Sequence, residues 1–279
     1  MVLQEAVYTI FDFETTGLFP YSGDKICEIG AIKICPRHKQ REAFHTLVNP
    51  ERPISSGAFM VNRITHDMVK DAPRIQEVMP DFMRFIHGSI LVAYNAGFDI
   101  GFLDHALGEE GRSLLSAFRV IDALRLARQL FPNLERYTLS SVADFLGIRF
   151  LKEHRAMHDA TMTLGVFQKE LTLLIERGAR TVEDIERISP EKEKPLTDAG
   201  RYTISVIRKA INEQRRLNIT YRSSWNNELT RRVITPRQIE SSYNRSYLVA
   251  YCHLRKAKRN FRLDSIIEAR VEEIPEKKR

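Results

Sequence analysis

The sequence predicts an α/β protein: a mixed five-stranded sheet with helices, followed by a small β-barrel. Strand-like apolar segments first follow one another directly and then alternate with segments of helical periodicity, the order of a mixed layer fold. After residue 178 the chain becomes charged and proline-marked, and a single amphipathic helix then precedes several short strand-like runs. The 279 residues suit about two domains. We place them at 1–178 and 201–279, joined by a charged linker at 179–200.

The first domain opens with three strand-like segments rich in β-branched and apolar residues, which we expect to pair as antiparallel neighbours. Apolar residues at helical spacing then alternate with two shorter strand-like runs. Asp122 and Thr138 stand where helix N-caps are expected. The expected strands are 7–14, 26–34, 44–48, 90–94 and 118–121, and the expected helices are 74–86, one starting near 99, 139–146 and 159–177.

The second domain begins with apolar residues at helical spacing between 204 and 217. Short strand-like runs separated by polar turns follow it, which is typical of a small barrel. These expected strands are 219–221, 232–234, 247–251 and 261–267.

Composition narrows the class of protein. Hydrophobic residues make up 43% and charged residues 28%, as in an ordinary globular chain. No apolar stretch approaches the ~20 residues needed to cross a bilayer, and no basic leader precedes the first apolar segment. We therefore expect a cytoplasmic protein without membrane contact. The three cysteines lack CxxC spacing, so neither a disulfide framework nor a zinc site is expected.

Positive charge is concentrated at the end of the chain. Residues 1–178 hold 20 Lys and Arg against 22 Asp and Glu, whereas residues 201–279 hold 19 against 8. A strongly basic segment behind a near-neutral one predicts an anionic partner, with nucleic acid the first choice.

Two carboxylates stand one residue apart in the first strand. Because strand side chains alternate between faces, Asp12 and Glu14 point the same way, and Phe11 and Phe13 point the other way. Like charges side by side on a half-buried strand repel, and a divalent cation between them removes the repulsion. Further on, Asp99 follows a strand, and His154 and Asp159 flank the start of the last helix. The five residues together predict a two-metal phosphodiester site.

The residues match a known pattern in three places: 11–18, 95–99 with Phe102 and Leu103 after it, and 154–156 with 159–160. This pattern resembles the DEDDh 3′ to 5′ exonucleases, a family that includes the proofreading epsilon subunit of bacterial DNA polymerase III. The resemblance covers about residues 5–177 and implies an RNase H-like fold. It also implies four carboxylate ligands for two Mg²⁺ or Mn²⁺ ions and a histidine that activates water. The implied catalytic residues are Asp12, Glu14, Asp99, His154 and Asp159.

The same resemblance implies a substrate-binding set around the terminal nucleotide. The turn after the acidic pair would lie against this nucleotide, and two phenylalanines would flank it. Where the family commonly has His-Gly, this chain has Asn62-Arg63, and Tyr94 stands where a His often occurs. These departures leave the five catalytic positions intact, so we expect them to affect substrate preference and not the chemistry. The implied substrate-binding residues are Thr15, Thr16, Gly17, Leu18, Phe98 and Phe102.

Residues 201–275 resemble a WYL domain, an Sm/SH3-like barrel, through the segments 219–221, 235–237, 246–252 and 259–266. Ser246 replaces the Trp of the family name, and Ser265 replaces a common Arg. The resemblance implies a basic basin for a nucleic acid or a small nucleotide ligand. Base stacking and phosphate contacts there would suit single strands. The candidates are Arg237, Tyr247, His253, Arg259 and Arg262.

Several points stay open at this level. Glu28 either supports the acidic site or simply packs at a strand end. Trp225 with Tyr243 and Tyr247 either stacks on bases or fills a small barrel. The basic run 255–259 is either a binding surface or a solvated hairpin tip.

The function we expect is metal-dependent 3′ to 5′ exonuclease action on nucleic acid ends. Single-stranded DNA is favoured, nucleoside 5′-monophosphates are the products, and the barrel binds or gates the strand. The resemblance places such an enzyme in DNA repair or proofreading. The alternatives are a regulator in which the WYL domain carries the function, and an exonuclease specialised for short oligonucleotides or RNA.

Overall fold

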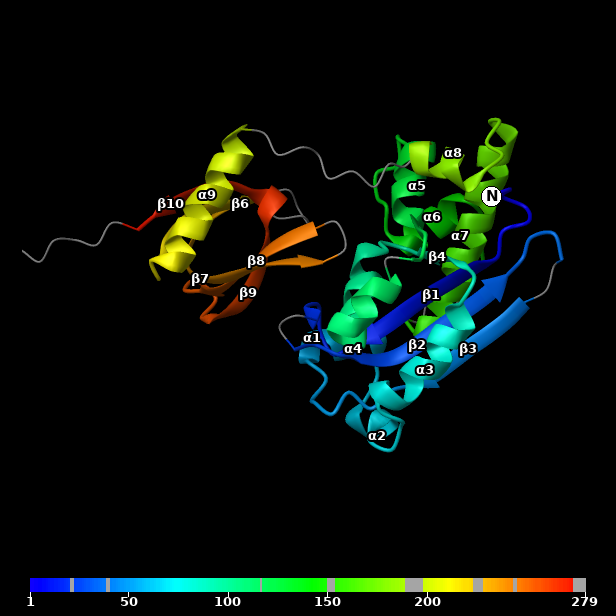
Figure 1. The fold of residues 1–279 in the computed structure, drawn as a ribbon, viewed down its shortest axis with the longest axis horizontal. Coiled ribbons are helices and arrows are strands. Elements are labelled where there is room, and N and C mark those ends of the chain that lie inside the picture. Colours follow the sequence, from blue (N-terminus) through cyan, green and yellow to red (C-terminus); the bar gives the residue numbers. More distant parts are fainter. Residues whose placement is uncertain are drawn as a thin grey trace, which may run out of the picture. The chain divides into compact units, whose positions relative to one another are not determined.

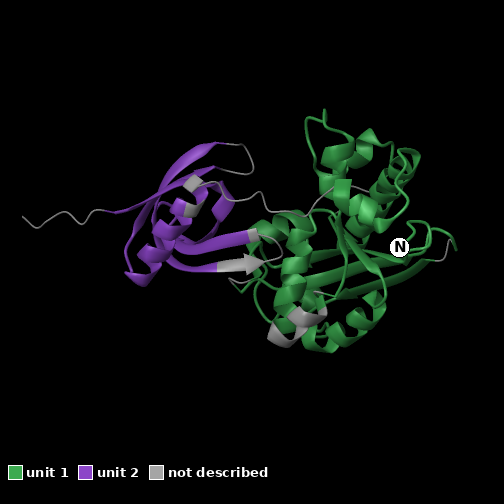
Figure 2. Cartoon of the chain, turned by 45° about the horizontal axis from the view of Figure 1, so that its top comes forward, with its two compact units in different colours: residues 1–190 green, residues 191–279 purple. Residues whose placement is uncertain are grey.

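The structure is a computed structural model. It describes residues 1–20, 23–38, 41–115, 117–149, 154–188, 198–222, 228–242 and 245–272. The chain divides into two compact units, residues 1–190 and 191–279 (Figure 2). Within the described residues, no helix has both the length and the apolar character needed to cross a membrane.

Unit 1 is built on a mixed five-stranded sheet in the order β3-β2-β1-β4-β5 (Figure 1). The first three strands pair antiparallel, whereas β4 and β5 add in parallel to β1 and to β4. Parallel neighbours require crossover connections, which the intervening helices supply. The expected five-stranded α/β sheet is thus confirmed, with strands β1 (Tyr8–Thr15), β2 (Ile26–Ile34), β3 (Arg41–Leu47), β4 (Ile90–Ala93) and β5 (Val120–Asp122).

The two faces of β1 pack against different helices. Tyr8 and Ile10 belong to the same core cluster as Phe167 of helix α7 (Ala156–Glu176). On the other face, the ring of Phe13 lies 5.7 Å from that of Phe82 in helix α3 (Ile75–Ile86). Since side chains alternate along a strand, Asp12 and Glu14 continue the row of Tyr8 and Ile10. The acidic pair therefore lies on the face of the sheet that α7 covers.

The remaining helices of unit 1 connect these layers. Asp122 accepts hydrogen bonds from the amides at the start of α5, and Thr138 accepts one at the start of α6, so both predicted caps are confirmed. Two short helices after β3, α1 and α2, were not expected from the sequence. Helix α7 begins at Ala156 rather than at Asp159. The other helices are α1 (Ser56–Asn62), α2 (His66–Val69), α4 (Gly97–Leu115), α5 (Ala123–Leu130) and α6 (Leu139–Phe145).

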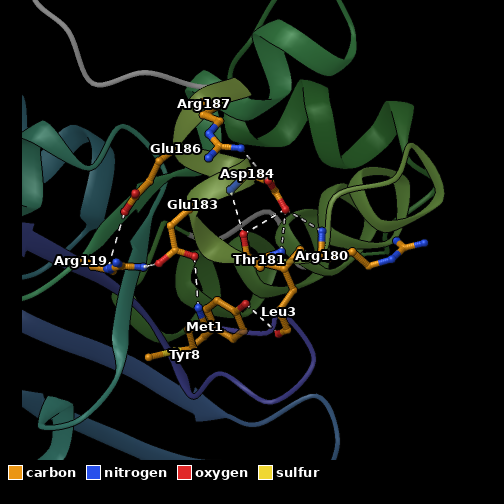
Figure 3. A network of polar contacts seen from close by, with 10 residues as sticks. All are labelled: Met1, Leu3, Tyr8, Arg119, Arg180, Thr181, Glu183, Asp184, Glu186 and Arg187. Atoms are coloured by element: carbon orange, nitrogen blue, oxygen red, sulfur yellow. Dashed lines mark hydrogen bonds and ion pairs between the residues drawn. The ribbon is translucent and has the colours of Figure 1, made fainter.

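The first part of the expected linker is a helix of unit 1. Helix α8 (Val182–Ile188) places Val182 and Ile185 in the main core cluster beside Leu3. Because most residues of this segment are charged, the sequence does not indicate that it packs in the core. The charged residues form a network, in which Glu183 binds Arg119 at 2.6 Å and the amino group of Met1 at 3.1 Å (Figure 3). Unit 1 thus extends at least through residue 188, and the rest of the expected linker, 189–197, lies outside the described residues.

Unit 2 is a small antiparallel β domain with the strand order β10-β6-β7-β8-β9. Helix α9 (Asp198–Asn212) covers its core through Ile207 and Ala210. The small β domain is confirmed, and the Sm/SH3-like barrel stays the prediction for its form. The strands are β6 (Leu217–Arg222), β7 (Leu229–Ser242), β8 (Arg245–Cys252), β9 (Ala257–Arg262) and β10 (Ile266–Val271).

The expected single strand 261–267 is wrong, because a 3₁₀ turn (Leu263–Ser265) divides it into β9 and β10. The side chains of Arg262 and Asp264 form a bidentate ion pair across this turn, with nitrogen to oxygen distances of 2.8 and 2.6 Å. Strand propensity alone does not reveal this local ion pair. Trp225 and Tyr243, for which stacking or barrel filling was left open, lie outside the described residues.

One buried carboxyl group in α7 lacks a hydrogen-bond partner among the residues that the structure describes. Glu170 is fully buried, and neither of its carboxyl oxygens has a hydrogen-bond partner among the described residues. Burial, together with the nearby Asp122, raises the pKa of Glu170 well above its usual value. A buried polar group without partners destabilises the fold, and more so when it must ionise.

We predict that Glu170→Gln removes a pH-dependent loss of stability. The folded chain holds the Glu170 proton more tightly than the unfolded chain, so the wild-type free energy of unfolding falls as the pH rises above the ordinary glutamate pKa of about 4.3. The variant should be more stable than the wild type by on the order of 1–3 kcal/mol at pH 8 and by much less at pH 5. Urea unfolding at both pH values measures this difference.

The exposed Glu176 of the same helix supplies the control. Glu176→Gln should change the free energy of unfolding equally at the two pH values. A Glu170→Gln variant whose stability relative to the wild type is the same at pH 5 and pH 8 would contradict the prediction.

Candidate active site

The acidic site forms where β1 meets the first turn of α7. Asp12 and Glu14 project from the α7 face of the strand, and Asp159 lies in the first turn of the helix. Each of these three residues offers one carboxylate oxygen, and the three oxygens lie within 4.8 Å of one another. Packing of an apolar strand row against an apolar helix row thus brings together carboxylates that are far apart in the sequence.

These carboxylates destabilise one another when charged. Burial, and then the charges of Asp99, Glu14 and Asp159, raises the pKa of Asp12 well above its usual value. Burial and the charge of Asp159 raise the pKa of Glu14 to about 8. A divalent cation among the oxygens would remove this repulsion, and a set of carboxylate oxygens is what Mg²⁺ and Mn²⁺ prefer. The donor set fits such an ion.

Asp99 borders the group without belonging to it. It lies in the first turn of α4, is 2% exposed, and accepts a hydrogen bond of 3.0 Å from the Phe13 amide through Oδ1. Burial raises the pKa of Asp99 well above its usual value, while that hydrogen bond opposes the shift. The fourth expected ligand is therefore beside Asp12, with one oxygen held by the backbone of β1.

His154 lies just before α7 and completes the set of five. Its Nδ1 is 3.6 Å from Oδ2 of Asp159, and its side chain is 64% exposed. Burial raises the pKa of Asp159, and the neighbouring His154 opposes this shift. The structure thus brings together all five residues that the sequence nominated, with the imidazole on the solvent side, where a water molecule can reach it.

In the turn after β1, the predicted residues have different roles. The hydroxyl of Thr15 donates to the Gly17 carbonyl at 2.6 Å, and Thr16 is fully buried and accepts from the Lys25 amide at 3.1 Å. These threonine side chains shape the turn, and their contact with a nucleotide stays a prediction. Leu18 is 67% exposed beside the site, so it remains the candidate contact of this segment.

Asp24 organises this turn and was missed from the sequence. Its carboxylate packs so closely on Gly17 that a Cβ at this position would lie 2.3 Å from Oδ2. The same carboxylate accepts a hydrogen bond from the Phe19 amide at 3.0 Å and pairs with Arg52 at 3.2 Å. Gly17 is therefore required by close packing. Asp24 lies outside the recognised pattern, and its role depends on a turn that brings it back.

Of the two phenylalanines in α4, only Phe98 remains a candidate to contact a nucleotide. Phe102 is 1% exposed, and its ring centroid lies 5.0 Å from that of Phe98. The expectation that Phe102 flanks the nucleotide is wrong, because one helical turn carries it into the core, where it supports Phe98 from behind.

Asn62, at one of the departures from the family pattern, contacts the catalytic strand. Its side-chain amide donates to the Thr15 carbonyl at 3.3 Å, and a hydrogen bond from it lowers the pKa of Glu14 against the larger effect of burial. Arg63 next to it adopts a left-handed conformation with φ 57°, which glycine adopts without strain. The Asn62 departure therefore bears on Glu14 itself, not on substrate preference alone.

In unit 2, strand alternation shows which of the residues predicted to line the basin lie on the same face of the sheet. Tyr247 and Tyr251 share one face of β8, while Leu248 and Ala250 point into the core. Tyr247 lies opposite Arg262 on β9, but Arg259 lies opposite Ala250 and so belongs to the other face. Arg259 is thus separated from the other candidates. The run 255–259 is a turn followed by the start of β9.

Lys258, not Arg259, completes the basic face. It lies opposite Tyr251 on β9. Arg237, at an irregularity of β7, lines a cavity together with Tyr251 and Lys258. Arg262 is engaged by Asp264, and His253 shares a hydrogen bond of 2.8 Å with Thr235. The face therefore combines two cations and an aromatic ring around one cavity.

Comparison with known proteins agrees with both units. A family model described as Exonuclease matches residues 9–167, more than half of the chain, and a model described as WYL domain matches residues 202–271. The chain belongs to the exonuclease family, whose DEDD members use divalent metals, and it carries a WYL domain after the exonuclease domain.

Curated relatives include much longer proteins. The chain is 38% identical over 203 residues to the PolC-type DNA polymerase III of Caldanaerobacter subterraneus subsp. tengcongensis. The aligned residues cover 73% of this chain and 14% of that protein. It is also 38% identical over 182 residues to a DNA polymerase III subunit epsilon-like protein of Rhodobacter capsulatus, covering 64% of this chain and 26% of the relative. The chain thus spans a small part of the relatives it matches.

Solved structures share the fold. Exonuclease X in complex with 5′ overhanging duplex DNA has 28% identity and a TM-score of 0.51, covering 65% of this chain and 99% of that one. Exonuclease I of E. coli in complex with a dT13 oligonucleotide has 14% identity and a TM-score of 0.54, covering 88% of this chain and 55% of that one. The RNase H-like exonuclease fold expected for unit 1 is confirmed.

Proposed function

We propose that this chain is a metal-dependent 3′ to 5′ exonuclease that hydrolyses single-stranded DNA ends to nucleoside 5′-monophosphates. The observation that carries the proposal is the group of Asp12, Glu14 and Asp159 oxygens within 4.8 Å of one another, with His154 beside it. Three mutually repelling carboxylates and an exposed imidazole at one place suit metal-assisted phosphodiester hydrolysis.

The residues divide the chemistry. Asp12, Glu14, Asp99 and Asp159 would hold two Mg²⁺ or Mn²⁺ ions, which, when bound, stabilise charge on the scissile phosphate and lower the pKa of the attacking water. His154 accepts the proton of that water, a role that its exposed position beside Asp159 allows. Leu18 and Phe98 contact the terminal nucleotide, and Gly17 lets the turn pack against Asp24.

Unit 2 is the proposed strand-binding part, and the domains are the exonuclease domain through about residue 188 and the WYL domain from about 201. Arg237, Lys258 and Tyr251 around one cavity suit phosphate contacts and base stacking on single strands. Exonuclease X was solved in complex with 5′ overhanging duplex DNA, and this supports DNA as the substrate. The epsilon-like and PolC-type relatives support a role in repair or proofreading.

Product analysis on matched strands tests the activity. The full chain is incubated with 5′-labelled single-stranded DNA and RNA of one sequence, with Mg²⁺, Mn²⁺ or a chelator. We expect a ladder shortened from the 3′ end, nucleoside 5′-monophosphates as products, faster loss of DNA than of RNA, and no reaction with chelator. Shortening from the 5′ end, or equal rates with chelator, would overturn the proposal. Preference for RNA or for short oligonucleotides would shift the substrate to the alternative.

We predict that Arg237→Ala with Lys258→Ala weakens strand binding and flattens its salt dependence. Each phosphate contact to a single strand adds about 0.7 to the slope of log affinity against log salt, so losing two should lower the slope by roughly 1.4. Fluorescence anisotropy with labelled dT oligonucleotides and the full-length Asp12→Ala variant, at several salt concentrations, measures the slope without cleavage.

Arg259→Ala with Lys256→Ala is the matched control, because it removes the same charge outside the cavity. An equal loss of slope in both double variants would mean that general charge, not this face, binds the strand. An unchanged slope in the first variant, with tight binding of a mononucleotide that Arg237→Ala abolishes, would favour the regulatory alternative with a small nucleotide ligand.

A further inference from the structure

A buried ion pair ties strand β2 to the residue next to His154. Glu28 is fully buried on β2, directly opposite Glu14 of β1. Its carboxylate accepts hydrogen bonds from two nitrogens of one guanidinium: Nη2 of Arg155 lies 2.6 Å from Oε1, and Nε lies 2.9 Å from Oε2. A bidentate pair of this kind fixes direction as well as distance.

Glu28 also caps helix α7 from outside. The N-cap residue of this helix, Arg155, makes no capping hydrogen bond with its own side chain, although the first amides of a helix need acceptors. Oε2 of Glu28 accepts from the Ala156 amide at 3.1 Å. One carboxylate on the sheet thus holds both the side chain and the backbone at the start of the helix.

Both oxygens of Glu28 are occupied by protein groups. Besides the contacts of Arg155, His45 of β3 lies 2.8 Å from Oε1. Burial alone would raise the pKa of Glu28, but the hydrogen bonds from Arg155, His45 and the Ala156 amide lower it below its usual value. This set of partners identifies Glu28 as a group that holds α7, not as a further metal ligand.

We propose that Glu28, acting through Arg155, is a positioning residue that fixes His154 and Asp159 against the Asp12–Glu14 pair. Asp159 lies in the first turn of α7, and His154 immediately precedes Arg155, so both depend on where this turn is held. The inference deepens the proposed exonuclease function and rests on it. Of the two roles that the sequence allows Glu28, this proposal takes support of the acidic site.

Kinetics and metal binding of full-length Glu28→Gln test the proposal. In either orientation of the new amide, its NH₂ group faces a nitrogen of Arg155, while the shape of the side chain is kept. We expect kcat on single-stranded DNA to fall 10–100-fold with KM within about twofold, and the Kd of Mn²⁺, measured by calorimetry without substrate, to rise about 10-fold. The double variant Glu28→Gln with Arg155→Gln should be no worse than the poorer single variant, because the two residues act as a unit.

Glu170→Gln is the matched control, since it makes the same substitution at a buried position of α7 far from the first turn. It should leave kcat and the Kd of Mn²⁺ unchanged. Equal losses in Glu28→Gln and Glu170→Gln, or a Glu28→Gln enzyme with wild-type kcat and Mn²⁺ affinity, would overturn the positioning role.

Two results separate this inference from the proposed function. A wild-type chain that binds Mn²⁺ but cleaves no strand contradicts the exonuclease proposal, and the Mn²⁺ affinity of Glu28→Gln still decides the positioning role. If Glu28→Gln does not fold, Arg155→Lys takes its place, because lysine keeps the charge but lacks the planar fork that makes both bonds. The same losses are then expected, and wild-type values would refute the role.

Discussion

Asp12→Asn is expected to abolish hydrolysis while making the metal-free protein more stable. The substitution removes one charged ligand oxygen and keeps the shape of the side chain. Losing a ligand removes several kcal/mol of transition-state stabilisation, and each 1.36 kcal/mol is a factor of ten in rate. We expect kcat to fall on the order of a thousandfold or more on a 3′-labelled single strand.

The stability gain follows from the repulsion within the site. Burial and the charges of Asp99, Glu14 and Asp159 raise the pKa of Asp12, so ionising the whole group destabilises the metal-free fold. In the folded chain the pKa of Glu14 is likewise raised to about 8. The free energy of unfolding of the metal-free protein therefore falls as the pH rises above the ordinary glutamate pKa. Thermal unfolding at pH 8 with chelator should show a higher Tm for Asp12→Asn than for the wild type.

With metal ions present, the wild type should instead have a higher Tm than Asp12→Asn. An ion present at 100 times its Kd stabilises the wild type by about 2.7 kcal/mol, whereas the variant, which lacks one ligand, gains much less. Asp104→Asn, a half-buried residue of α4 outside the acidic group, is the control and should show neither effect. A variant with full activity, or with the same metal-induced rise in Tm as the wild type, would refute the assignment of Asp12 as a ligand.

The grouping of the five candidate residues was predictable from the sequence, because period-two alternation and helix position decide where those side chains point. Asp12 and Glu14 share a face in any strand, and Asp159 was expected in the first turn of α7, where the structure has it. The apolar rows that flank them fix which helix covers that face. The five residues of the site therefore follow from local rules and a single packing step.

What the sequence did not reveal depends on contacts between distant segments. Asp24 supports Gly17 only because a turn brings it back, and α8 joins the core through two apolar residues in a charged segment. Arg259 and Lys258 look equivalent in a basic run. As consecutive residues of β9 they lie on opposite faces, and only the register of β8 and β9 shows that Lys258 shares the face of Tyr251. Register and close approach are properties of the assembled sheet, which composition does not encode.

Gly30→Ala is expected to cost both stability and activity, because this glycine lets α7 approach the sheet. Gly30 lies opposite Asp12 on β2, and a Cβ there would meet the Ala156 carbonyl carbon and the Met157 nitrogen at 2.4 Å. These are backbone atoms of the first turn of α7, which cannot move aside without shifting Asp159. We expect a loss of about 3 kcal/mol, at the upper end of overpacking effects, and at least a tenfold fall in kcat.

Gly165→Ala is the matched control, because it adds the same methyl group on α7 itself. There the Cβ would meet Cγ2 of Ile148 at 3.1 Å, a side-chain contact that a shift of a few tenths of an ångström relieves, and alanine favours the helix by about 1 kcal/mol over glycine. This variant should keep its kcat and lie within about 1 kcal/mol of the wild type. Urea unfolding and single-turnover cleavage compare the two alanines. If Gly30→Ala kept the wild-type free energy of unfolding and kcat, the start of α7 would not be fixed by its contact with β2. The packing of α7 on the sheet would then not determine the position of Asp159.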